Sequence, residues 1–80
     1  MPHIPPQPSL LRERFPITLP DGRTWQGALY GTYRRGGRRI IVSGQAGAVL
    51  FDTGDQFDFD NARNELDLWL AEQVKAEAVA

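Results

Sequence analysis

The chain has 80 residues, 41% of them hydrophobic, and a formal net charge of −1 at pH 7. This length predicts one small domain with a thin core, and the absence of cysteine excludes disulfides and thiolate metal sites that would support it. No apolar stretch approaches the ~20 residues of a membrane-spanning helix, and the start of the chain lacks the order of a signal peptide, so we expect a soluble, cytoplasmic protein.

The charge is divided unevenly along the chain. Residues 1–39 contain seven arginines against Glu13 and Asp21, a net charge of +5. Residues 40–80 contain eight acids against Arg63 and Lys75, a net charge of −6. Such asymmetry often accompanies a charged partner, and it also suits a fold that pairs its two halves. The sequence leaves both explanations open.

The first ten residues are rich in proline and are expected to be an extended tail, ahead of a single domain formed by residues 11–80. From Arg12 the pattern alternates, with Phe15, Ile17 and Leu19 on one side, which predicts a first strand. Because Pro16 has no backbone donor, we expect this strand at an edge of the sheet.

The turn Pro20-Asp21-Gly22 separates this strand from a second strand, predicted over residues 24–34. On the second strand Gly27 and Gly31 share a face with larger apolar residues, and strand glycines often mark the close approach of another element. We therefore expect the C-terminal helix to pass over these two glycines.

The pair Gly36-Gly37 predicts a two-residue hairpin turn leading to a third strand over residues 39–43. The alternation does not decide whether Ile40 and Val42 or Ile41 faces the core. A fourth strand is predicted over residues 48–52, followed by a short extended piece over residues 56–59.

A C-terminal helix is predicted over residues 61–77, with Asp60 as its N-cap. The expected fold class is α+β: an antiparallel meander of four or five strands with this one helix packed across one face. The predicted core contains residues from both layers, namely Phe15, Ile17, Trp25, Leu29, Val49, Phe51, Leu66, Trp69 and Leu70.

Asp52-Thr53-Gly54 matches the short active-site signature of aspartic proteases. That chemistry needs two facing aspartates that share a proton, which a homodimer could supply. However, only 26 residues follow Gly54, most of them predicted helix, whereas the retroviral enzymes place most of their chain after the signature. We therefore interpret the match as a strand that ends in a turn, with Asp52 bonding its own backbone.

His3 is the only histidine, and it lies in the tail, so the predicted domain cannot form a Ser-His-Asp triad or a histidine metal site. Residues 52–58 do not match the twelve-residue calcium loop, and no glycine-rich phosphate loop followed by lysine is present. We predict no enzymatic activity, no catalytic residue, no metal site and no cofactor.

Two charged sets are candidates for recognition. Clustered carboxylates can imitate nucleic-acid phosphates and occupy a basic channel of a protein partner. The acidic set, with one apolar anchor, comprises Asp55, Asp58, Asp60, Glu65, Asp67 and Leu68. A basic hairpin can instead enter a nucleic-acid groove, with tyrosines that stack on bases. This arginine set comprises Tyr30, Arg34, Arg35, Arg38 and Arg39. The ordinary alternatives are helix capping, solvated surfaces and pairing between the two sets.

A short meander followed by the segment FDFDNARNELDLWLAEQ resembles the small phage-encoded anti-CRISPR proteins, especially the inhibitors of type I systems. The resemblance rests on Asp58-Phe59-Asp60 at the strand exit and on Leu66, Trp69 and Leu70 in the helix. It covers roughly residues 56–72 closely, and the rest in size and layout. It implies a stoichiometric inhibitor without a cofactor that binds the Cascade surveillance complex of a bacterial host and blocks target-DNA recognition.

The alternative function is a small regulatory or nucleic-acid-binding module that uses the arginine set. Such a module should bind bare DNA with strongly salt-dependent affinity, whereas a protein inhibitor need not bind DNA. The sequence leaves the oligomeric state open.

Overall fold

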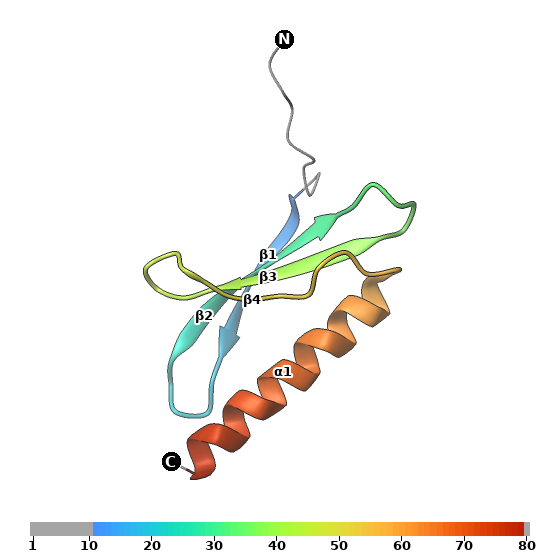
Figure 1. Ribbon diagram of the computed structural model, residues 1–80. Helices are drawn as coiled ribbons and strands as arrows, with labels where there is room; N and C mark the ends of the chain where they lie inside the picture. Colours follow the sequence, from blue (N-terminus) through green and yellow to red (C-terminus); the bar gives the residue numbers. More distant parts are fainter. Residues whose placement is uncertain (1–10, 80) are drawn as a thin grey trace.

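The computed structural model describes residues 11–79, with side chains up to residue 76. In this part of the chain one antiparallel sheet contains β1 (Leu11–Thr18), β2 (Thr24–Gly31), β3 (Arg38–Ser43) and β4 (Val49–Asp52) in chain order. One helix, α1 (Phe59–Val79), lies across one face of the sheet (Figure 1). The predicted α+β meander with a single helix is confirmed, and the sheet has four strands.

The predicted tail, residues 1–10, lies outside the described residues. Within the described residues, no helix is both long enough and apolar enough to cross a membrane.

The β1–β2 hairpin has the predicted turn. Leu19 N donates to Arg23 O (2.8 Å), Gly22 N donates to Leu19 O (2.9 Å), and Gly22 has a φ of 95°. Among residues 11–79, β1 pairs only with β2, as expected for an edge strand. Because hydrogen-bonded and non-bonded pairs alternate from Leu19–Arg23, Pro16 lies opposite Gln26 in a non-bonded pair. The nitrogen of Pro16 therefore faces the open edge, where its missing hydrogen costs no bond to β2.

The prediction of a two-residue Gly36-Gly37 turn is wrong. β2 ends at Gly31, and the connection runs over residues 32–37. It is closed by bonds from Thr32 N to Gly37 O (3.2 Å) and from Gly37 N to Arg34 O (2.8 Å). Within this connection Gly36 alone has a positive φ, of 76°. Only one of the two glycines takes a left-handed conformation, so the Gly-Gly pair did not identify the turn type.

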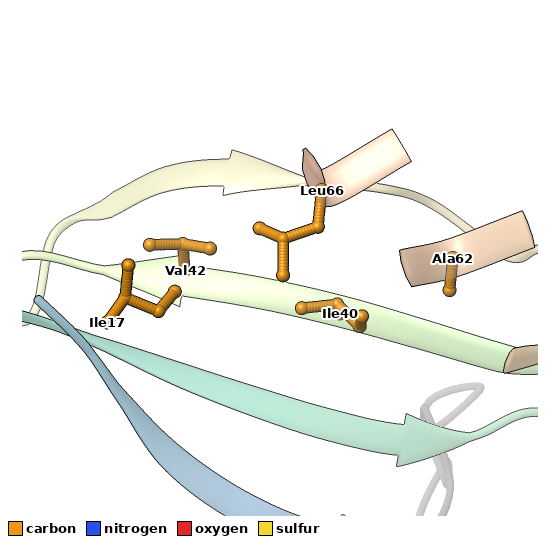
Figure 2. Packing of buried hydrophobic residues seen from close by; sticks show 5 residues of the cluster. All are labelled: Ile17, Ile40, Val42, Ala62 and Leu66. Carbon is orange, nitrogen blue, oxygen red and sulfur yellow. The ribbon is translucent and has the colours of Figure 1, made fainter. Parts of the chain in front are cut away.

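The core lies between β3 and α1. Ile40 and Val42 are the most enclosed side chains, with 1% and 0% of their surface exposed. They form one buried cluster with Ala62 and Leu66 of α1 and Ile17 of β1 (Figure 2). The sequence did not decide which face of β3 points into the core. The structure shows that it is the face of Ile40 and Val42.

The predicted core is correct except at Val49, which is 62% exposed. A register shift between Val42 and Ser43 puts Val49 opposite Ser43, where α1 does not cover it. Ile17 and Leu66 are buried, and the other predicted core residues pack half-buried against them: Phe15, Trp25, Leu29, Phe51, Trp69 and Leu70.

The N-cap of α1 is Asp58 and not Asp60 as predicted. Asp58 Oδ1 accepts a hydrogen bond from Asn61 N (2.9 Å), the bond that an N-cap side chain makes with the third helical residue. Consequently α1 starts at Phe59, and Asp60 lies in its first turn. Both carboxylates remain at the positive end of the helix dipole.

α1 is not the element that approaches the strand glycines. The ring of Phe15 lies against Gly27, its cross-strand partner, and the side chain of Arg12 lies against Gly31. A side chain at Gly27 would overlap that ring, so the glycine leaves the space that the ring of Phe15 occupies.

We expect Gly27→Ala to lower the free energy of unfolding by about 1–3 kcal/mol, because its methyl group must displace the ring of Phe15. Gly31→Ala is the matched control, since there only the flexible end of Arg12 has to move. Urea unfolding followed by tryptophan fluorescence measures both. Equal losses in the two variants would contradict the explanation.

Candidate protein-recognition surface

Two connections that are distant in sequence lie side by side at one end of the sheet (Figure 1). Arg38 N donates to Gln56 O (3.1 Å), and Gln56 N donates to Arg38 O (2.9 Å). Thr53 N donates to Ile40 O (3.0 Å), and Ile40 N donates to Thr53 Oγ1 (3.0 Å). The residues after β4 therefore continue to pair along β3, which fixes the β4–α1 connection against the start of β3.

Two aromatic side chains project from these connections. Tyr33 is 70% exposed and Phe57 is 65% exposed. The guanidinium of Arg34 lies over the ring of Phe57, 4.4 Å from its centroid. These three residues line a hollow of about 350 Å³ together with the polar residues Thr32, Asp55 and Gln56. We call residues 32–34 and 55–57 the aromatic corner.

Some polar groups in the aromatic corner form hydrogen bonds within the protein itself. Gln56 Nε2 donates to Thr53 O (2.6 Å), which holds this side chain against the connection. Thr32 Oγ1 is enclosed and has no hydrogen-bond partner among the described residues. The hollow thus combines a fixed amide, a cation and a carboxylate with two exposed rings.

The aromatic corner brings together one member of each predicted set, Arg34 and Asp55. Sequence reasoning considered Tyr33 only as a tyrosine that could stack on bases, and it missed Phe57. A signal was present, because Tyr33 lies next to an arginine-glycine turn and Phe57 lies between acidic residues. Alternation alone assigned both to strands, where an aromatic residue needs no further explanation.

The acidic set does not form one surface. Asp55 belongs to the aromatic corner, and Asp58 caps α1. Residues two apart on a helix point about 200° apart, so Glu65 and Asp67 lie on opposite flanks of α1. Asp67 accepts a hydrogen bond from Arg63 Nε (3.2 Å), an exposed ion pair one turn apart.

The remaining two members of the acidic set divide in the same way. Asp60 lies seven residues before Asp67 and therefore on the same flank of α1. Leu68 is exposed and lies three residues after Glu65, on the other flank.

The arginine set also separates. Arg34 lies in the aromatic corner, and Arg35 is exposed beside it at the tip of the connection. Arg38 is half-buried, and its Nη1 donates to a neighbouring backbone carbonyl (2.7 Å). Arg39 lies on the sheet face opposite α1, paired across the strands with Tyr30.

Arg39 holds Asp52 in a two-bond ion pair. Arg39 Nε donates to Asp52 Oδ1 (2.8 Å), and its Nη2 donates to Oδ2. Gly54 N also donates to Asp52 Oδ1 (2.9 Å), which confirms that Asp52 bonds its own backbone at a strand end. The hydrogen bond from Arg39 lowers the pKa of Asp52, and desolvation opposes this effect less strongly. This pair joins the basic and acidic halves of the chain.

Among the side chains that the structure describes, in residues 11–76, no three potential metal ligands gather at one place. Comparison with known proteins found no family model, no curated protein and no solved structure that matches the chain.

We expect the ion pair of Asp52 to make stability depend on pH. Because folding lowers the pKa of Asp52, its contribution is present above the ordinary aspartate value of about 3.9 and is lost as the pH falls through the lower folded value. The Asp52 side chain is 31% exposed, so screening limits the contribution to about 0.5–1 kcal/mol.

Thermal unfolding of the wild type and of Asp52→Asn between pH 7 and pH 2 measures this dependence. The difference in Tm should shrink below about pH 4. Glu65→Gln is the control, because Glu65 has no ion pair within the described residues. A difference in Tm between the wild type and Asp52→Asn that stays constant with pH would contradict the prediction.

Proposed function

We propose that this protein is a non-enzymatic inhibitor that acts by binding another protein through the aromatic corner. The observation that carries the proposal is the exposure of Tyr33 and Phe57, at 70% and 65%, beside Arg34 and Asp55. Aromatic and arginine side chains dominate binding energy at protein interfaces when a partner encloses them. The neighbouring charges of both signs would fix the orientation of that partner.

The backbone pair between Arg38 and Gln56 supports the same proposal. It holds the two connections together in the free protein, and Arg34 already lies over Phe57. A surface that is ordered before binding loses less conformational entropy when the partner arrives.

The proposed partner is the Cascade complex of a type I CRISPR system, in the cytoplasm of a bacterial host. The support is the resemblance of roughly residues 56–72 to small anti-CRISPR proteins. Phe57 lies within that segment, and Asp55 immediately precedes it, so the resembling segment supplies one side of the aromatic corner. Binding there would block recognition of target DNA.

Nucleic-acid binding is the second candidate function. The stacking of Arg34 on Phe57 favours it, because single-stranded nucleic acids bind on aromatic rings supported by arginine. However, Arg39 is neutralised by Asp52, which leaves Arg34 and Arg35 at the corner. Two phosphate contacts predict a slope of only about −1.4 to −1.8 for log affinity against log salt.

A gel shift of target duplex DNA tests the proposal. Purified type I Cascade is mixed with the protein before the DNA is added, and a parallel lane contains the protein and DNA alone. We expect loss of the Cascade shift and no shift by the protein alone. An intact Cascade shift would exclude the complex tested, and a shift by the protein alone would favour nucleic-acid binding.

Variants then identify the surface. We expect Tyr33→Ala combined with Phe57→Ala to weaken inhibition by about tenfold or more, since each truncation removes interface contacts. Leu68→Ala is the matched control, because it removes an exposed apolar side chain from the outer flank of α1. Loss of inhibition only in Leu68→Ala would assign binding to the helix and contradict the role of the corner.

A further inference from the structure

α1 covers only part of its sheet face. Strands lie about 4.8 Å apart, so the outer strands of a four-stranded sheet are about 14 Å apart, whereas a helix with its side chains is about 10–12 Å wide. α1 packs mainly on β3, and Trp69 stacks on Phe51 of β4 with 4.8 Å between ring centroids. On the β1 side, no second helix of the described chain lies beside α1.

A groove of about 400 Å³ lies between β1, β2 and α1. Phe15, Ile17 and Leu29 line it from the strands, and Phe59, Leu66 and Leu70 line it from one flank of α1. Phe59 is the most exposed of these residues, at 42%. We call this feature the β1–α1 groove. It is lined by a different part of the sheet from the aromatic corner, and the two share no lining residue.

We propose that the β1–α1 groove binds an amphipathic helix of a partner protein. A second helix packed beside α1 at an interaxial distance of about 8–10 Å would lie two strand spacings away from β3, and therefore over β1. An added strand fits less well, because Pro16 offers no N–H on the open edge of β1. From Phe59 to Leu70 the wall of the groove is about 17 Å long at 1.5 Å per residue, which matches three turns of a partner helix.

The charged residues that line the groove favour a basic helix. Three charged residues line the groove, namely Glu13, Arg63 and Asp67. Arg63 donates to Asp67 (3.2 Å), and Glu13 has no ion pair within the described residues. Arg12 lies toward Gly31 on the neighbouring strand and does not line the groove. A lysine or arginine beside the apolar stripe of the partner would therefore meet the carboxylate of Glu13.

A synthetic peptide of about 14 residues serves as the probe, with leucines on one helical face and lysines on both sides of that face. A second peptide has the same composition with the leucines spread around the helix. Calorimetric titration into the full chain should show saturable binding of the first peptide. The affinity for the second peptide should be at least about tenfold lower.

Charge reversal on the rim provides the specific test. Glu13→Lys should lower the affinity for the basic peptide by about fivefold at low salt. Glu65→Lys makes the same change on the opposite flank of α1 and should stay within about twofold of the wild type. A peptide with glutamate in place of lysine should prefer Glu13→Lys.

This inference goes beyond the proposed function, and its test is separate. The variant with Tyr33→Ala and Phe57→Ala should bind the basic peptide like the wild type, because neither residue lines the groove. Equal binding of the two leucine peptides, no saturation up to about 1 mM, or equal effects of the two charge reversals would overturn the proposal.

Discussion

The contact between β3 and α1 holds the two layers of this protein together. Ile40 and Val42 meet Ala62 and Leu66 there, and these are among the few side chains that the fold fully encloses. Because one helix covers only about two strands, packing on β3 leaves the β1–β2 part of the same face less covered. The groove beside β1 is thus a direct consequence of where α1 lies.

The same contact determines the aromatic corner. The chain leaves β4 at Asp52 and must return over β3 to begin α1 at Phe59. It does so by pairing Gln56 with Arg38, and this short path turns Phe57 outward beside the β2–β3 connection. The position of Phe57 therefore follows from the requirement to bring α1 onto β3. Because Phe57 is exposed, it adds nothing to the hydrophobic core, which is small in a chain of this length.

The charged halves of the chain meet at Arg39 and Asp52, yet most other charges remain at the surface. Exposed aromatic side chains gather in the corner, and half-buried apolar side chains gather in the groove. Small domains bury a modest share of their surface, so single exposed apolar side chains need no explanation. Apolar side chains that cluster, as in the corner and the groove, favour a role in recognition. The two proposed binding surfaces are therefore separate parts of the molecule.

The sequence by itself determined the order of the elements, the edge position of β1 and the self-bonded turn at Asp52, because alternation, proline and turn residues act through local torsions and donors. Only the tertiary structure decided the exposure of Val49, the cap at Asp58 and the placement of Arg34 and Asp55 around one hollow. These features depend on strand register and on where the helix packs. The local alternation of residues specifies neither, because it does not say which face of a strand points inward.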